Sequence, residues 1–406
     1  MISEINQRIT QLNNGEVPSG YKKTSVGIVP NEWTEHTLGD IFIFKNGLNK
    51  EKGAFGQGTP IVNYTDVWKK RGLRAKDING RVALSEKEIQ TYEAKAGDVF
   101  FTRTSETIDE IGYSSVLLED VENAVFSGFV LRARPYNDLV HREYHQYCYS
   151  EPLMRQEIIK RSSMTTRALT SGPMLSQVAI NLPSHREQSK IAEILMKWDE
   201  AIELQEQYII NLKKKKLSIM RNLFSFSNEC ILPFKDVVKP HKYKKELQTS
   251  QYQETGSIPV VDQGKNKIVA YTDNKDYIIS PPEKGLLLFG DHTTEVKYIN
   301  YEFAVGGDGV KLFEEKVPYL LKYVYYYLIT FPFLIEGYKR HYSILRNKPI
   351  KFPIREGKID RKKMDEVVLI LSRFDEMIDL HTTKMRELKK QRKALQQYLL
   401  NGIVRV

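Results

Sequence analysis

The chain contains an internal repeat at a fixed distance. The segment 198–202 (WDEAI) recurs at residues 374–378 (FDEMI), a shift of 176 residues. The same shift places Ile191 on Val367 and Leu223 on Leu399, so that more than thirty consecutive positions align without a gap. A fixed internal period indicates repeated structural units. The sequence therefore predicts two copies of one structural unit, each ending in a long helix. A basic chain with two such copies is suited to recognise two sequence elements on one DNA duplex.

The length and the net charge narrow the classes of protein to which this chain can belong. A chain of 406 residues is too long for one ordinary core, and two domains with connecting helices are expected. Hydrophobic residues make up 41%, which is enough for folded domains. The net charge of +10 favours a polyanionic partner, although a protein that is merely basic has the same composition.

The cysteines and the N-terminus indicate an unexported protein. Cys148 and Cys230 cannot build a disulfide framework or a thiolate zinc site, which fits a reducing cytoplasm. The first residues carry an acid and lack the apolar core of a signal peptide. Since no apolar run approaches the ~20 residues of a membrane helix, no membrane partner is expected.

Residue patterns predict the order of elements. A short amphipathic helix is expected over 1–14, and helices also near 137–159 and 318–330. Strands are expected at 41–44, 98–102, 124–126, 258–261, 285–289 and 303–305, and the segment 350–353 matches the segment 180–183. Long helices are predicted over about 184–224 and 361–400, and Asn401-Gly402 ends the second.

Both long helices carry an apolar stripe with alternating steps of three and four residues. A stripe along roughly 60 Å is too long for one small domain to cover. We therefore expect the two helices to form an antiparallel coiled coil, although packing of each helix on its own domain remains open. The residues expected to pack are Ile191, Leu195, Trp198, Ile202, Ile209, Leu212, Val367, Leu371, Phe374, Ile378, Met385 and Leu388.

The sequence contains partial matches to several catalytic motifs, but each lacks a required residue or spacing. The run 280–283 (SPPE) lacks the aromatic residue that an amino methyltransferase loop stacks on a flipped base. Asp291, Glu295 and Lys297 have the residue types of a metal-dependent nuclease but not the separation of its carboxylates. The acid in 141–145 (HREYH) is one place too late for a zinc protease, and no Walker phosphate loop is present. The sequence therefore predicts neither a catalytic nor a metal site.

Basic and small polar residues gather outside the long helices, in the predicted loops. Arginine and lysine can bind guanine edges or phosphates, so these loops are candidates for entry into a major groove, with a solvated surface as the alternative. The lysine run 213–216 is assigned to the outer face of the helix instead. The candidate DNA-binding residues are Lys69, Lys70, Arg71, Arg74, Arg103, Thr104, Arg161, Thr165, Thr166, Arg167, Lys242, Lys244, Lys245, Lys265, Lys267, His292, Arg340, His341, Arg346 and Lys348.

Four segments carry a family resemblance. They are 20–33 (GYKKTSVGIVPNEW) with 38–40 (LGD), 97–104 (GDVFFTRT), 182–195 with its Leu-Pro, Glu-Gln and IAEIL elements, and 399–406 (LLNGIVRV). With these marks and the helix repeat, the chain resembles the specificity subunit of type I restriction-modification systems over essentially its full length. The second half departs at 354–358 (IREGK), where the family would have Glu-Gln.

The resemblance implies an α+β fold with a pseudo-two-fold internal repeat. Two similar target recognition domains would each read one half of a bipartite site in double-stranded DNA, and the coiled coil would separate them and set the spacer. The N-terminal helix would lie beside the C-terminal end of the chain. The expected divisions are an N-terminal helix and lead-in (1–20), recognition domain 1 (21–183), the central helix (184–225), recognition domain 2 (226–360), and the C-terminal helix and tail (361–406).

The resemblance also implies partners and an absence of chemistry on this chain. The helices would dock methylation subunits, two in number, and restriction subunits would join them. S-adenosylmethionine, ATP and Mg²⁺ would be bound by those partners, and no cofactor or metal by this chain, which would not be an enzyme. Two alternatives stay open: a stand-alone pseudo-dimeric DNA-binding regulator, and an enzyme using Asp291 or Glu283.

Overall fold

The computed structural model describes residues 2–317, 319–332 and 340–406 and divides into two compact units. Unit 1 consists of residues 1–204 and 386–406, and unit 2 of residues 205–385. The division passes through both long helices, so each unit contains a part of each helix. The predicted domains end instead where the helices begin.

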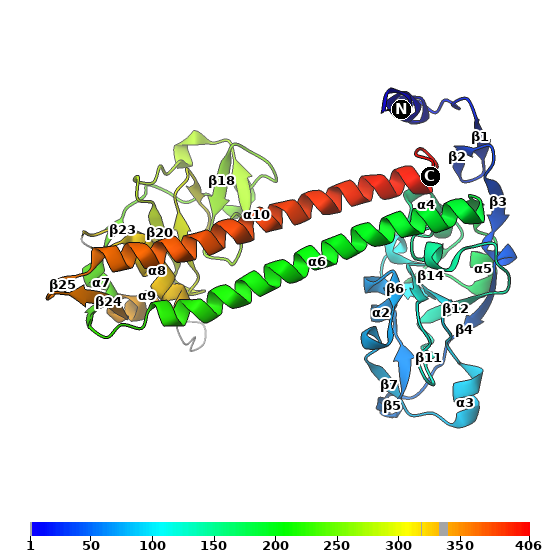
Figure 1. Cartoon of the computed structure of the whole chain (residues 1–406), viewed down its shortest axis with the longest axis horizontal. Helices are drawn as coiled ribbons and strands as arrows, with labels where there is room; N and C mark the ends of the chain where they lie inside the picture. Colours follow the sequence, from blue (N-terminus) through cyan, green and yellow to red (C-terminus); the bar gives the residue numbers. More distant parts are fainter. Residues whose placement is uncertain (1, 318, 333–339) are drawn as a thin grey trace. The chain divides into compact units, whose positions relative to one another are not determined.

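Unit 1, whose residues 1–204 run from blue to green in Figure 1, is built on a five-stranded sheet in the order β4-β12-β8-β10-β6. These strands are β4 (Phe42–Asn46), β6 (Gly72–Leu73), β8 (Val99–Thr102), β10 (Ser114–Leu117) and β12 (Val130–Pro135). A second sheet has the order β11-β5-β7, with β5 (Phe55–Val62), β7 (Gly80–Val82) and β11 (Val125–Phe126). A third, β13-β14-β9, contains β9 (Thr104–Ser105), β13 (Ser163–Met164) and β14 (Ala168–Leu169). Two-stranded pairs join β1 (Tyr21–Thr24) to β2 (Gly27–Pro30) and β3 (Thr34–Thr37) to β15 (Ala179–Leu182).

Short helices connect the strands of unit 1. The α-helices are α1 (Ile2–Asn13), α2 (Tyr64–Lys69), α3 (Glu86–Thr91), α4 (Pro152–Lys160) and α5 (Gly172–Ser176). The 3-10 helices are η1 (Leu38–Asp40), η2 (Lys52–Ala54), η3 (Ala75–Asp77), η4 (Ile108–Glu110) and η5 (Arg142–Gln146). The single helix predicted at 137–159 is wrong: η5 and α4 stand there, separated by extended backbone at Glu151 before Pro152, which lacks an N–H and occupies the first turn of α4.

Unit 2 has a central four-stranded sheet in the order β17-β23-β20-β21. Its strands are β17 (Val238–His241), β20 (Leu286–Gly290), β21 (Val296–Ile299) and β23 (Val310–Glu315). The sheet β19-β18-β22 contains β18 (Ile258–Val261), β19 (Ala270–Thr272) and β22 (Ala304–Val305), and the sheet β16-β24-β25 contains β16 (Glu229–Pro233), β24 (Pro349–Arg355) and β25 (Lys358–Ile359). The helices are α7 (Phe234–Val237), η6 (Thr249–Gln251), η7 (Lys275–Tyr277), α8 (Leu321–Thr330) and α9 (Tyr342–Asn347).

The sheets of the two units have the same connectivity. The order β17-β23-β20-β21 repeats β4-β12-β8-β10, and every neighbouring pair in both runs is antiparallel. In unit 1, β5 pairs parallel with β11, the strand before the turn into β12. In unit 2, β18 pairs parallel with β22, the strand before the turn into β23. The middle strands β8 and β20 are buried at every position, as expected of short apolar runs covered on both faces.

The two long helices, α6 (His185–Leu223) and α10 (Arg361–Leu400), end close to their predicted positions. They run antiparallel within unit 1, where Glu187 pairs with Arg405 and Asp199 with Arg392. They also run antiparallel within unit 2, where Gln205 contacts His381 and Lys216 pairs with Asp375.

The predicted packing residues of these helices are all buried or half-buried. Ile191 and Leu195 belong to the core of unit 1, together with Leu399 of the other helix, while Val367 and Leu371 belong to the core of unit 2. Ile209, Leu212 and Phe374 are also buried, and Trp198, Ile202, Ile378, Met385 and Leu388 are half-buried. Near its N-terminus each helix therefore packs on its own domain, and its predicted residues further along are buried or half-buried as well.

The two ends of the chain meet in unit 1, as the resemblance implied. Arg8 of α1 donates to the carbonyl of Ile403 at 2.5 Å, and the Tyr21 hydroxyl donates to the carbonyl of Gly402 at 2.6 Å. Arg405 bridges the carboxylates of Glu187 and Glu32. Among the described residues, no helix has the length and apolar character needed to cross a membrane.

Candidate nucleic-acid interface

Three loops of unit 1 join at the C-terminal end of β8. Arg103 follows β8, and its backbone N–H donates to the carbonyl of Phe129, in the turn between β11 and β12, at 3.0 Å. The carbonyl of Arg103 accepts from the backbone N–H of Thr170, after β14, at 3.0 Å. We call these three residues the strand-end frame of unit 1.

Unit 2 contains the same backbone arrangement at the end of β20. The N–H of Asp291 donates to the carbonyl of Gly309 at 2.8 Å, and the carbonyl of Asp291 accepts from the N–H of His341 at 2.8 Å. Asp291, Gly309 and His341 form the strand-end frame of unit 2. The frames share their hydrogen bonds, yet no position carries the same residue type in both, so one backbone geometry presents two different chemistries.

Several predicted residues of unit 1 lie around its frame. Thr104 is in β9, which pairs with β14, and β14 pairs with β13, whose turn carries Thr165, Thr166 and Arg167. Arg167 forms an exposed ion pair with Glu106 at 2.9 Å. Arg161, at the C-terminal end of α4, donates to the side chain of Gln177 at 2.9 Å. The structure thus brings the predicted residues Thr104 and 165–167 together on one small sheet, directly after Arg103.

The other predicted group of unit 1 lies around β6, on the edge strand of the five-stranded sheet. Lys70 pairs with Asp77, and Arg74 pairs with Glu119 at 3.1 Å, so both cations have acidic partners. Arg71 lines a cavity of about 380 Å³ against the α6–α10 pair of unit 1. The side chain of Lys69 lies outside the described residues.

In unit 2 the basic run after β17 lies beside the frame turn. Leu247 donates to the carbonyl of Val305 at 2.8 Å and accepts from the N–H of Gly307 at 3.1 Å, which ties the run to the turn before β23. The run lines a cavity of about 540 Å³. Its predicted residues Lys242, Lys244 and Lys245 are exposed, and Lys245 lies 3.6 Å from Asp276 and over the ring of Tyr277.

A glutamine that the candidate set omits connects two loops of unit 2. The Gln263 side chain accepts from the backbone N–H of His292 at 3.1 Å and donates to the carbonyl of Asp308 at 3.1 Å. Predicted Lys265 is exposed two residues further on, whereas Lys267 pairs with Asp379 of α10 at 2.9 Å. The predicted residues His292 and Lys265 therefore lie near the frame, and Lys267 is directed to the helix.

The prediction for His341 needs correction. Its side chain is fully buried, and its Nδ1 lies 3.0 Å from the carbonyl of Asp291, so it has no surface to offer DNA. Arg340 and Arg346, on either side, are exposed. Lys348 is half-buried, and burial lowers the pKa of its amine.

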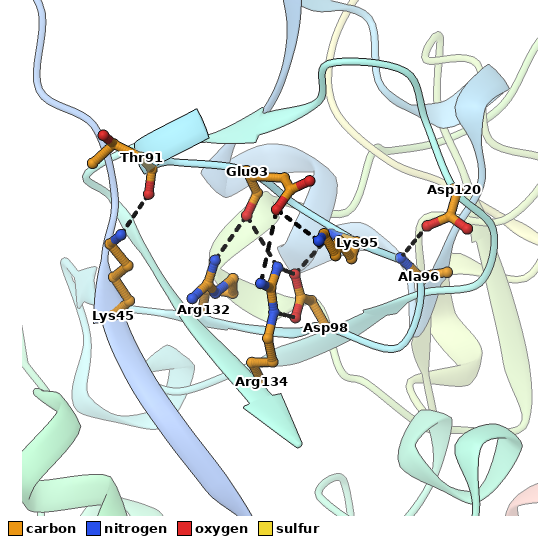
Figure 2. Close-up of polar contacts among 9 residues, drawn as sticks. All are labelled: Lys45, Thr91, Glu93, Lys95, Ala96, Asp98, Asp120, Arg132 and Arg134. Carbon is orange, nitrogen blue, oxygen red and sulfur yellow. Dashed lines mark hydrogen bonds and ion pairs between the residues drawn. The ribbon is translucent and has the colours of Figure 1, made fainter. Parts of the chain in front are cut away.

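The opposite end of β8 is fixed by a buried ion pair (Figure 2). Arg134 of β12 donates from Nε and Nη2 to the two carboxylate oxygens of Asp98 at 2.7 Å each, and Asp98 is only 1% exposed. Arg132 and Arg134 also donate to the carbonyl of Glu93 at 2.8 and 3.2 Å. This network locks β8 to β12 at one end, so the strand-end frame at the other end is held on a rigid sheet.

Two polar clusters join α6 and α10, one in each unit; we call them helix staples. In unit 1, Arg392 donates to both carboxylate oxygens of Asp199 at 2.8 and 3.0 Å, and the Tyr147 hydroxyl donates to the same carboxylate at 3.0 Å. The Arg392 guanidinium also lies 5.5 Å from the Tyr147 ring centroid. Burial raises the pKa of Tyr147, so it remains a donor.

The staple of unit 2 has the same arrangement, with a lysine in place of the arginine. Lys216 donates to Asp375 at 2.6 Å, the Tyr326 hydroxyl donates to Asp375 at 2.7 Å, and the Lys216 amine lies 5.2 Å from the Tyr326 ring centroid. Burial also raises the pKa of Tyr326. The repeat shift of 176 residues carries Asp199 onto Asp375 and Lys216 onto Arg392, so the two staples are sequence equivalents.

Two side chains of the incomplete nuclease motif make hydrogen bonds to the backbone of unit 2. The Asp291 carboxylate accepts from the N–H of Tyr342 at 2.7 Å, and Lys297 donates to the carbonyls of Asp262 and Asn266 at 2.8 and 2.6 Å. Within the described ranges, no group of three or more His, Cys, Asp or Glu residues could hold a metal ion. These side chains fix loops of unit 2.

Comparison with known proteins finds a family match in the first half of the chain. Residues 30–214 match the type I restriction modification DNA specificity domain. A putative type I restriction enzyme MjaX specificity subunit from Methanocaldococcus jannaschii is 23% identical and covers 95% of this chain and 97% of its own length. The Escherichia coli EcoR124I/EcoR124II specificity subunit is 29% identical over 42% of this chain and 44% of its own length.

Solved structures agree at the level of the fold. The S subunit of a type I restriction-modification system from M. genitalium has a TM-score of 0.56 at 15% identity and covers 90% of this chain and 96% of its own. A chain from a study of complex assembly and conformational transition in the type I system has a TM-score of 0.55 at 15% identity and covers 93% of this chain and 99% of its own. The resemblance drawn from the sequence is confirmed. The relatives are named specificity subunits, which confirms the expectation of a recognition subunit rather than an enzyme.

Proposed function

We propose that this chain, which carries the type I restriction-modification specificity domain, reads a bipartite DNA site, with one half-site read by each unit. The supporting observation is the pair of strand-end frames. A common backbone geometry places loops of both units in the same way relative to a central sheet, while Arg103, Phe129 and Thr170 give way to Asp291, Gly309 and His341. Equal geometry with unequal side chains is what an asymmetric two-part site requires, because base edges are distinguished by the groups that meet them.

The helix pair acts as the spacer between the half-sites and relates the two units by a pseudo-two-fold axis. The equivalent staples of the two units support this, because an axis must turn one into the other. The contact between Gln205 and His381 supports it further: the amide of Gln205 lies 2.7 Å from the Nδ1 of His381, and the repeat shift carries one residue onto the other. Equivalent residues that touch each other lie next to the axis of a two-fold pair.

Two methylation subunits dock on the helices. Leu204 of α6 is 64% exposed and Leu380 of α10 is 66% exposed, and the repeat shift makes them equivalents. Such exposed apolar side chains on a helix favour a protein partner, and an equivalent pair suits two copies of one partner. Further exposed apolar side chains on the helices are Met196, Ile210, Leu217, Leu369 and Ile370.

The chemistry of the assembly then belongs to the partner subunits. Methylation subunits would bind S-adenosylmethionine, restriction subunits would use ATP and Mg²⁺, and this chain would supply recognition alone, in the cytoplasm. A stand-alone regulator would share the repeat and the charge. The exposed leucines of α6 and α10 favour the subunit, because a regulator that works alone has no partner to cover them.

A domain exchange tests the reading of half-sites. Residues 30–180 are replaced with the first recognition domain of another specificity subunit, and methylated adenines are mapped in DNA from cells that also carry the methylation subunit. One half of the modified sequence should change while the other half and the spacer persist. An unchanged modified sequence would contradict the proposal.

A second experiment tests the docking surface. Leu204→Asp and Leu380→Asp should each weaken co-purification with the methylation subunit, and the double variant should abolish it. Ile43→Asp is the matched control, because Ile43 is 60% exposed on edge strand β4. Equal co-purification of all four variants would rule out docking at these leucines.

A further inference from the structure

One aromatic side chain projects from the strand-end frame of unit 1. Phe129 is 61% exposed, whereas the next residue, Val130, is fully buried at the start of β12. An exposed phenyl ring of this size forgoes the stabilisation that burial would give it. Its position in the frame makes it a candidate for contact with whatever the frame binds.

The turn that carries Phe129 is held by hydrogen bonds on both sides. Ser127 N–H donates to the carbonyl of Val62 at 3.0 Å, and Gly128 N–H donates to the carbonyl of Leu48 at 2.7 Å. The carbonyl of Phe129 accepts from Arg103, as described above. Because the backbone is already fixed, a ligand that meets the ring would incur little ordering cost, which favours a recognition role.

The loops joined in the frame of unit 1 also carry exposed apolar side chains and a guanidinium group. Leu169 is 37% exposed and lies directly opposite Thr104 in the β14–β9 pair, and Met164 of β13 is 51% exposed. The Nε of Arg103 is buried and has no hydrogen-bond partner within the part of the chain that the structure describes. The frame of unit 1 therefore offers an apolar surface beside a guanidinium group.

The frame of unit 2 has a glycine at the position that corresponds to Phe129. Gly309 occupies the position of Phe129 in the hydrogen-bonded frame, with a φ of +78°. A Cβ there would meet the ring of His292 at 2.8 Å and the amide of Gln263 at 3.0 Å. The missing side chain makes room for two polar ones, so at this frame position only unit 1 carries an apolar side chain.

We propose that Phe129 recognises thymine in the half-site read by unit 1, through contact of its ring with the thymine 5-methyl group in the major groove. This rests on the proposed function. The 5-methyl group is the apolar feature that distinguishes bases in the major groove, where the other groups are hydrogen-bond donors and acceptors. The exposed phenyl ring complements a methyl group, whereas Arg103, whose backbone N–H donates to the Phe129 carbonyl, suits phosphate or guanine.

The test is a thermodynamic cycle between the ring and the methyl group. The complex of this chain with its methylation subunits is titrated with duplexes that carry the mapped site, in which each thymine of the unit 1 half-site is replaced in turn by deoxyuridine. At one or two positions the wild type should lose about four-fold in affinity, since a buried methyl group contributes roughly 0.8 kcal/mol and 1.4 kcal/mol is tenfold. With Phe129→Ala the same replacement should have no effect.

Controls separate this contact from other causes. Tyr136→Ala removes an aromatic residue that is 54% exposed just beyond the other end of β12, and it should keep the wild-type response to deoxyuridine. The proposal is overturned if wild type and Phe129→Ala lose the same factor at every position. It is also overturned if Phe129→Ala weakens binding equally for thymine and deoxyuridine duplexes, which would indicate insertion between bases. Both results leave site-specific methylation intact, whereas failure of the proposed function would appear first as the absence of a mapped site.

Discussion

The buried pair of Asp98 and Arg134 gives a quantitative test of how unit 1 is stabilised. Asp98 is 1% exposed, whereas the Arg134 side chain is 30% exposed. The two partners therefore differ in how well water can replace a lost contact. We expect removal of the arginine to cost more than removal of the carboxylate charge.

The magnitudes follow from the contacts. In Arg134→Met the Asp98 carboxylate stays buried with the N–H of Lys95, at 2.8 Å, as its remaining hydrogen bond described here, and the loss should be about 4 kcal/mol, within the range for breaking a buried pair. In Asp98→Asn the guanidinium keeps the carbonyl of Glu93 and gains water, so the loss should be about 2 kcal/mol after allowance for solvent screening. The double variant removes both charges and should be more stable than Arg134→Met alone.

Urea unfolding followed by tryptophan fluorescence provides the assay. All three tryptophans, Trp33, Trp68 and Trp198, lie in unit 1, so fluorescence reports this unit without a contribution from unit 2. Lys197→Met is the control, since its pair with Glu193 is exposed and its removal should leave the midpoint unchanged. A larger loss for Asp98→Asn than for Arg134→Met would refute the reasoning from burial.

Three further outcomes are expected. Gly47→Ala should lower the stability of unit 1 by about 1–3 kcal/mol in the same urea assay, because its Cβ would lie 2.1 Å from the carbonyl oxygen of Ser127, whereas Gly53→Ala, with open space around it, should not. Burial lowers the pKa of His145 to about 3, below its unfolded value of ~6.5, so between these pH values the unfolded state binds one more proton than the folded state. The free energy of unfolding should therefore fall by about 1.4 kcal/mol for each pH unit as the pH drops through this window. His145→Gln should remove that contribution in unfolding curves measured at pH 4 to 7. Insertion of seven residues after position 204 and seven after position 380 should lengthen the spacer in mapped methylation sites by about 3 base pairs, since each helical residue rises 1.5 Å and each base pair 3.4 Å; an unchanged spacer would contradict the role of the helices.

The spacing of apolar residues was sufficient to predict the elements whose formation depends on neighbouring residues in the chain. The long helices were predicted to within a residue or two, because an apolar stripe at steps of three and four has only one regular solution over forty residues. The buried strands β8 and β20 were found from short apolar runs. The helix predicted at 137–159 failed because its apolar residues serve the core of unit 1 from a 3-10 turn and a short helix, which side-chain spacing does not distinguish.

The candidate interface was only partly accessible from the sequence. Basic residues in loops were identified by type, but type does not reveal which cations face one another, pair with acids or become buried. Lys70 and Arg74 have acidic partners, His341 is enclosed, and Lys267 is directed to α10. Phe129 was missed, because an isolated aromatic residue between two short strands is typical of a core.

By itself, the sequence determined the duplication, the two long helices and the family resemblance, because these are recorded in periodicities and local motifs that do not depend on contacts with distant residues. Tertiary structure alone decided which side chains meet at the ends of β8 and β20. There, loops separated by up to about 70 residues in unit 1 are joined by backbone hydrogen bonds that any residue except proline can donate. Those bonds fix the position of each side chain without constraining its identity, so two halves with one backbone plan present different groups to their ligand.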